Sequence, residues 1–291
     1  MYGHNLMLGI FAGLIGLWTI IRIRRHDRFD PEPRRIILLS VILGALAMGL
    51  AVWVQSWLSR LAPDDALKPD LAGRAYFAAK AALTEEAAKL AVVIAMWRLI
   101  PRHFNEAIDG IMYGTFVGIG AALAETCFIL FIAKEPIDLP TQEVMRILGH
   151  FIMGGIGGFA IGLFAQGHHR RWIIAPLCVF GACALHFMWD LLSYRMEDLP
   201  ANEEDVRARL KGLSFVAMSL VISGTLAYHG LLEWGKRISA WHHNRPPNDP
   251  VRPHPLSEFF PLPRTPSVIP TRSTPGDAAA PPAPPSGTLK P

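Results

Sequence analysis

Charged residues are scarce in this sequence of 291 residues, because Asp, Glu, Lys and Arg make up only 18% of it while 51% of its residues are hydrophobic. Soluble globular domains carry about 25% charged residues, so the composition excludes an ordinary soluble protein. The basic residues occur in short clusters between apolar runs, and no basic face with interleaved aromatic residues is present. This distribution excludes a nucleic acid as the expected partner.

Cysteine is also rare. The three cysteines, Cys127, Cys178 and Cys183, all lie in apolar runs and form no Cys-x-x-Cys pair, which argues against a disulfide framework and a cysteine-based zinc site. Nucleophile motifs are missing as well, since Thr84 and Ser193 have no Gly-x-Ser-x-Gly setting and no cysteine has an evident base beside it. The sequence therefore does not predict a serine or cysteine hydrolase.

Long apolar runs are abundant. A bilayer core of about 30 Å needs roughly 20 apolar residues in helical form, and seven runs meet that length. They are predicted at residues 5–22, 36–59, 73–99, 107–133, 147–166, 172–194 and 212–235. The predicted fold class is an all-α polytopic membrane protein with about seven transmembrane helices.

Basic residues next to the spans predict the orientation of the chain. Lys and Arg accumulate in cytoplasmic loops, and the loop between the first two spans is the richest in arginine. It holds Arg22, Arg24, Arg25, Arg28, Arg34 and Arg35. We therefore expect a multi-pass protein of the cell membrane with an external N-terminus and a cytoplasmic C-terminus.

The C-terminal segment, residues 245–291, differs from the rest of the chain in composition. It contains 15 of the 24 prolines, and such a segment forms neither a helix nor a packed core. It is predicted to be a disordered cytoplasmic tail. The alternative interpretation is a ligand for a cytoplasmic partner that recognises proline.

Several ionisable residues lie inside the predicted spans, where each costs a few kcal/mol of insertion free energy and so requires a reason. They are Glu85, Glu86 and Lys89 in the third span, Glu125 in the fourth, His150 in the fifth, and His186 and Asp190 in the sixth. All are expected in the half of the membrane nearer the external surface. This placement predicts a single polar cluster.

Helical spacing indicates that these residues face inward. Glu85 and Lys89 are four residues apart, as are His186 and Asp190, so each pair shares one helix face. Small residues line the faces of the other two groups, as at close contacts between membrane helices. Gly114, Gly118 and Ala121 precede Glu125 at helical spacing, and Gly154, Gly157 and Gly158 follow His150.

Carboxylates and histidines together can hydrolyse an amide, with a glutamate as the base that activates water and His186 as an oxyanion donor whose ring Asp190 fixes. Two alternatives use the same residues. A metalloenzyme would hold a zinc ion with Glu125, His150, His186 and Asp190, although short zinc-binding spacings are absent. A proton-coupled transporter or channel would use the buried carboxylates as a relay.

The motifs resemble, in order and context, the PrsW family of intramembrane proteases, distant relatives of the type II CAAX prenyl endopeptidases. They are Glu85-Glu86-x-x-Lys89, Asp109-Gly110 leading to Gly118-x-Gly120 and Glu125, Arg146-x-x-Gly-His150, and His186-x-x-x-Asp190. The resemblance covers residues 73–194, which would form a four-helix catalytic core. Residues 1–72 would add two N-terminal spans, residues 195–244 an external loop and the last span, and residues 245–291 the tail.

The resemblance implies a role for each of these residues. Glu85 would be the base and Glu86 the partner of Lys89, Glu125 and His150 would hold the water or the leaving amine, and His186 with Asp190 would stabilise the oxyanion. Arg146 and Asp109 would be supporting residues. The implied reaction is cleavage of a membrane-anchored protein near its extracytoplasmic side, typified by an anti-sigma factor. No cofactor is favoured, and zinc is the alternative.

Overall fold

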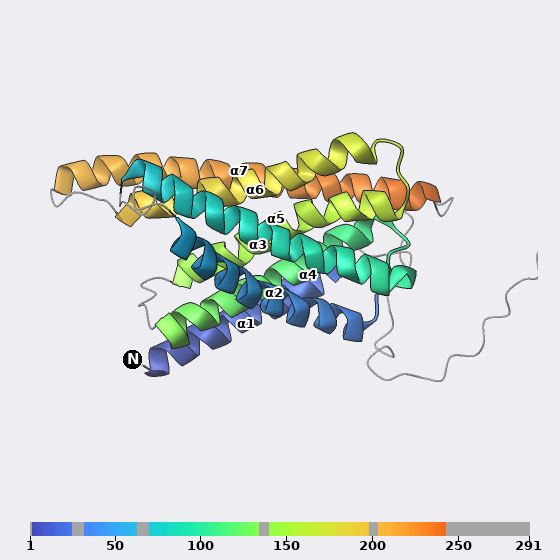
Figure 1. The fold of residues 1–291 in the computed structure, drawn as a ribbon, viewed down its shortest axis with the longest axis horizontal. Helices are drawn as coiled ribbons and strands as arrows, with labels where there is room; N and C mark the ends of the chain where they lie inside the picture. The colour runs from blue at the N-terminus through green and yellow to red at the C-terminus, as the bar shows by residue number, and fades with distance from the viewer. Residues whose placement is uncertain (1, 25–31, 63–69, 134–139, 198–202, 243–291) are drawn as a thin grey trace, which may run out of the picture. The chain divides into compact units, whose positions relative to one another are not determined.

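The computed structural model describes residues 2–24, 32–62, 70–133, 140–197 and 203–242. The predicted tail lies outside these residues. Within them the chain forms seven long α-helices and no strand, which confirms the predicted fold class (Figure 1). The long helices are α1 (Tyr2–Arg24), α2 (Arg34–Leu61), α3 (Leu71–Leu99), α4 (Ala107–Cys127), α5 (Pro140–Ala165), α6 (Arg171–Glu197) and α7 (Glu203–His242).

Five helices in the described part of the chain are long and apolar enough to cross a membrane. They are found at Arg34–Leu61, Ala107–Phe131, Val144–Ala165, Arg171–Tyr194 and Gly212–Ala240. Helix α3 is equally long but contains Lys80, Glu85, Glu86 and Lys89 near its middle, so it does not meet the same test. Large apolar side chains such as Trp53 of α2 and Phe215 of α7 are exposed, as expected of surfaces that face lipid.

Helix α4 lies at the centre of the bundle (Figure 1) and packs mainly against α5 and α2, with further contacts to α3 and α7. Every residue of α4 from Ala107 to Ala122 is buried. A helix that is apolar on all sides belongs in the interior rather than at a surface. Helix α4 therefore provides the support on which the surrounding helices, and the site they carry, are placed.

Glycines allow α4 and α5 to cross at very short distance. A Cβ atom on Gly118 would lie 2.2 Å from the carbonyl oxygen of His150, and one on Gly114 would lie 2.1 Å from that of Gly154. No larger residue fits there without moving a backbone. The predicted close contact is thus present for Gly114, Gly118 and Gly154, whereas Gly157 faces α6, with its nearest contact at Ala182.

Several helix boundaries differ from the sequence-based prediction: α5 begins at Pro140 instead of residue 147, and α7 ends at His242 instead of residue 235. Two further differences concern the end of the fourth span and the start of the last. The fourth span was predicted as one helix over 107–133, but its last residues form a π-helix, η3 (Phe128–Ala133), directly after α4. The last helix begins at Glu203 instead of residue 212, so part of the predicted external loop is helical. Negatively charged residues stabilise the N-terminus of a helix, and α7 begins with Glu203, Glu204 and Asp205. Hydropathy does not detect this start, because the three residues are polar.

Candidate active site

Helices α3, α4, α5 and α6 bring the predicted ionisable residues together, and α4 contributes Glu125. Helix α3 supplies Glu85, Glu86 and Lys89, all of them buried. Buried His150 comes from α5 and buried His186 from α6, and their rings meet edge to face with centroids 5.5 Å apart. Residues separated by up to a hundred positions in the sequence thus form one contiguous cluster, which is what a shared inward face requires.

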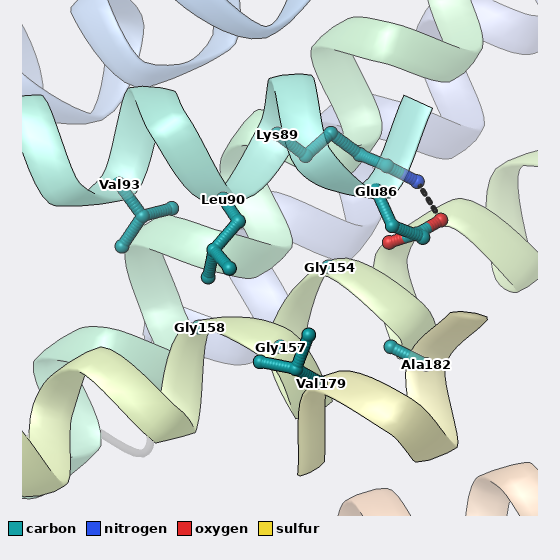
Figure 2. Close-up of a pocket in the computed structure, with 9 residues that line it drawn as sticks. All are labelled: Glu86, Lys89, Leu90, Val93, Gly154, Gly157, Gly158, Val179 and Ala182. Atoms are coloured by element: carbon teal, nitrogen blue, oxygen red, sulfur yellow. Dashed lines mark hydrogen bonds and ion pairs between the residues drawn. The ribbon is translucent and has the colours of Figure 1, made fainter. Parts of the chain in front are cut away.

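Glu86 accepts two hydrogen bonds within the cluster. Its Oε1 accepts hydrogen bonds from Lys89 Nζ at 2.5 Å and from His186 Nδ1 at 2.7 Å. Figure 2 shows the Glu86–Lys89 ion pair beside a small pocket between α3, α5 and α6 that is otherwise lined by apolar side chains and glycines. Charge-assisted bonds in such an apolar setting are strong, so Glu86 is held as an ionised structural anchor.

Lys89 also connects Glu86 to a second histidine. Its Nζ lies 3.2 Å from His150 Nδ1, and because an ammonium group can only donate, Nδ1 is the acceptor. The proton of the neutral ring then sits on Nε2, which donates to Glu125 Oε2 at 2.9 Å. Arg146 Nε completes this chain at 3.4 Å from Glu125 Oε1.

Glu85 differs from its neighbour, because it accepts one hydrogen bond instead of two and its other oxygen is buried without a donor among the described residues. Oε1 accepts a hydrogen bond from Gln55 Nε2 at 3.1 Å. Oε2 is buried without a hydrogen-bond partner among the described residues, and it faces His186 Nε2 at 3.6 Å. A buried carboxylate oxygen with no donor is costly and is the group in the cluster best able to accept a proton.

The structure corrects the predicted role of Asp190 in holding the His186 ring. Asp190 Oδ2 lies 3.5 Å from His186 Nε2, which is ion-pair distance, whereas the ring is hydrogen-bonded through Nδ1 to Glu86. Four-residue spacing places Asp190 on the correct face, but the carboxylate of α3 approaches the other nitrogen more closely. Glu86 therefore orients the ring, and Asp190 adds negative charge beside Nε2.

Asp109 does not belong to the cluster. It is the third residue of α4, and its Oδ2 accepts a hydrogen bond from the backbone N–H of Glu106 at 2.7 Å, as half of a capping box. Such reciprocal bonds satisfy backbone groups that a helix start leaves open. Its contribution is to fix the N-terminus of the central helix.

Gln55 is the residue of the site that the sequence analysis missed. It lies on α2, thirty positions before Glu85, and donates to both Glu85 and Thr84. The sequence feature that could have indicated Gln55 is its side-chain amide, the single one in a span of mean hydropathy 2.5. Gln55 carries no ionisable group, so a pattern of charged residues within the spans does not include it.

Comparison with known proteins assigns the chain to a family. Residues 32–223 match the sequence model of a family described as "PrsW family intramembrane metalloprotease". The chain belongs to the PrsW family. It is similar to Protease PrsW of Bacillus subtilis (strain 168), with 26% identity over 173 residues, or 57% of this chain and 73% of that protein. It is also similar to Protease PrsW of Clostridioides difficile (strain 630), with 24% identity over 191 residues, or 64% of this chain and 77% of that protein.

Membership of the PrsW family makes this chain an intramembrane protease, as the resemblance of its motifs implied. No solved structure matches it. The match begins at residue 32, so it includes α2 and Gln55, which the resemblance over residues 73–194 did not cover.

The family description names a metalloprotease, which would require a set of side chains with free donor atoms around one metal ion. Both ring nitrogens of His150 are engaged, Nδ1 with Lys89 and Nε2 with Glu125. Across the described ranges, no three His, Cys, Asp or Glu side chains gather their donor atoms as a metal ion requires. Lys89, a cation, also occupies the middle of the cluster. This arrangement does not fit a metal centre.

Proposed function

We propose that this PrsW-family protease hydrolyses a peptide bond of a membrane-anchored protein by glutamate-activated water, near the extracytoplasmic side of the membrane. The observation that carries the proposal is the buried Oε2 of Glu85, which has no donor among the described residues and lies 3.6 Å from His186 Nε2. Glu86 is the weaker candidate for the base, because Lys89 and His186 already donate to its Oε1.

The reaction begins when Glu85 removes a proton from water and the resulting hydroxide attacks the scissile carbonyl carbon. The carbonyl oxygen becomes an oxyanion, to which His186, when doubly protonated, donates from Nε2. Glu86 holds Nδ1 of that ring. When the C–N bond breaks, Glu85 returns its proton to the leaving amine, so the carboxylate is regenerated.

Glu125, His150 and Arg146 form the other side of the proposed site. Glu125 is the more accessible carboxylate, with 30% of its side chain exposed, and it is held by His150 Nε2 and Arg146 Nε. A carboxylate that is fixed but still open to one side can accept a hydrogen bond from the amine of the substrate. We assign Glu125 and His150 to holding the water or the leaving amine.

The proposed substrate is a membrane-anchored protein that is cleaved in regulated proteolysis, with an anti-sigma-like factor as the example. Two further proposals concern topology and partners. The N-terminus would be external and the C-terminus cytoplasmic in the cell membrane, and the proline-rich segment 245–291 would reach a cytoplasmic partner.

Glu85→Gln tests the proposal, since it keeps the shape of the side chain and removes the base. We expect a loss of cleavage of about 10²- to 10⁴-fold, the range for general-base catalysis, with binding of the uncleaved substrate retained. The measurement is co-purification of trapped membrane proteins, identified by mass spectrometry, followed by cleavage of the identified protein in proteoliposomes. Glu233→Gln is the matched control, because Glu233 is an exposed carboxylate of α7 that pairs with Lys236 of the same helix and does not belong to the cluster.

If Glu85→Gln cleaves the substrate at the rate of the parent protein, the proposed mechanism is overturned. The family description names a metalloprotease, so a metal-dependent protease with Glu125, His150, His186 and Asp190 as ligands is the alternative to test, although these side chains as they lie do not fit a metal centre. Inhibition by a chelator that added zinc reverses would establish that version. Dissipation of a pH gradient by the parent in liposomes, but not by Glu125→Gln, would instead indicate a proton-coupled transporter or channel.

A further inference from the structure

The amide of Gln55 is the only described group that donates a hydrogen bond to Glu85. Its Nε2 lies 3.1 Å from Glu85 Oε1 and 3.0 Å from Thr84 Oγ1. An amide nitrogen carries two hydrogens, so one Gln55 side chain can make both bonds at once. Helix α2 thereby reaches the proposed base directly.

Gln55 stands in an otherwise apolar setting. Helix α2 is the most hydrophobic of the candidate spans, with a mean hydropathy of 2.5. Trp53 and Trp57 on either side of Gln55 are more than half exposed and face outward, whereas Gln55 is directed toward α3. A polar amide in such a helix must find partners inside the bundle, and the partners it has are Thr84 and Glu85.

We infer that Gln55 is a positioning residue, which holds Oε1 of Glu85 so that Oε2 remains the free oxygen facing His186. The inference rests on the proposed role of Glu85 as the base. The terminal torsion of a glutamate side chain is broad, so without a donor the carboxylate can rotate away from His186. The hydrogen bond to Oε1 selects one orientation and leaves the other oxygen for water.

A purely structural role for Gln55 would be to join α2 to α3. The same two helices have a second polar contact, in which Lys80 Nζ donates to Ser59 Oγ at 2.5 Å. Ser59 lies one helical turn from Gln55 and does not contact Glu85. Ser59→Ala therefore removes a contact between α2 and α3 without touching the base, which makes it the matched control.

Three substitutions separate the two roles. Gln55→Met keeps the length of the side chain and removes the donor, Gln55→Glu removes the donor and adds a negative charge beside Glu85, and Gln55→His keeps a ring N–H at similar reach. The assay measures cleavage in proteoliposomes of the substrate that Glu85→Gln has identified. We expect Gln55→Met to lower kcat about 10- to 100-fold, as for the loss of a hydrogen bond to a charged group. KM should not change, Gln55→Glu should be less active still, and Gln55→His should recover part of the rate.

A second measurement needs no substrate. Dicyclohexylcarbodiimide modifies protonated carboxyl groups in apolar surroundings, and mass spectrometry resolves which glutamate reacts. A carboxylate that loses a donor is more easily protonated, so Glu85 should be labelled faster in Gln55→Met and at the parental rate in Ser59→Ala. Labelling at this position should be absent from Glu85→Gln.

The inference is overturned if Gln55→Met has the kcat of Ser59→Ala, or if its Glu85 is labelled at the parental rate. That result leaves the proposed function intact as long as Glu85→Gln is inactive. If Glu85→Gln cleaves like the parent, the proposed function fails. Faster labelling in Gln55→Met would still establish the contact between Gln55 and Glu85, because labelling does not depend on cleavage.

Discussion

Lys89 joins the two histidines of the site, His150 by direct contact and His186 through Glu86. It donates to Glu86, which holds His186, and it lies 3.2 Å from His150, which holds Glu125. Neutralising one member of a buried ion pair leaves the other charge without compensation. Lys89 is therefore expected to matter for folding as well as for activity.

Lys89→Met should destabilise the protein by about 3–5 kcal/mol, the cost of breaking a buried pair from one side. The measurement is the temperature at which the detergent-solubilised protein loses its monodisperse peak on size exclusion. The double variant Lys89→Met/Glu86→Gln should recover much of that temperature, because no uncompensated charge remains, but it should not recover cleavage. If Lys89→Met loses its monodisperse peak at the same temperature as the parent, the stabilising ion pair with Glu86 is contradicted.

The crossing of α4 and α5 determines where His150 lies. The carbonyl oxygen of His150 is the atom that a Cβ on Gly118 would approach to 2.2 Å. The backbone carrying this histidine is thus set by the absence of a side chain on the neighbouring helix. A small change on α4 consequently acts on the hydrogen bond between His150 and Glu125.

Gly118→Ala should destabilise the protein by about 1–3 kcal/mol, the usual cost of overpacking, and should lower cleavage by moving His150. Thermal stability in detergent and cleavage in proteoliposomes measure the two effects. Gly49→Ala on α2 is the control, since a Cβ there meets nothing within 4 Å, and it should resemble the parent. Equal behaviour of the two variants would contradict the close crossing.

The described helices form one bundle whose outer surface carries large apolar side chains, among them Leu38 and Leu46 of α2 and Met218 and Leu226 of α7. The bundle therefore suits a lipid environment.

The orientation of the bundle in the membrane depends on charge. With six arginines between the first two spans, we expect a cytoplasmic C-terminus. A fluorescent-protein fusion that matures only in the cytoplasm should fluoresce when placed after His242, and a periplasmic phosphatase fused there should be inactive. The opposite pattern would invert the proposed topology.

The proline-rich segment should be dispensable for the chemistry. Residues 243–291 lie outside the part of the chain that the structure describes, and all residues of the candidate site belong to the described helices. Truncation after Asp249 is expected to leave membrane insertion and the cleavage rate in proteoliposomes unchanged. A lower rate with purified components would show that the segment acts on the site itself, whereas loss of activity only in cells would indicate a partner.

Hydropathy and helical spacing were sufficient to predict the seven helices, the inward direction of Glu85, Glu86, His150 and His186, and the motifs that relate the chain to the PrsW family. The reason is local: an apolar run of membrane length must be helical, and a buried charge must face other helices. Spacing along one helix could not show that Glu86 rather than Asp190 orients His186, because the competing group comes from another helix.

Packing between helices decided the rest. Gln55 reaches Glu85 from α2, and Asp109 remains at the helix start as a cap, although both lie in helices whose existence the sequence predicted. Which oxygen of which carboxylate stays without a donor depends on distances of a few tenths of an ångström between side chains of different helices. Those distances arise only when glycine-lined backbones such as α4 and α5 meet, so no reading of a single helix could supply them.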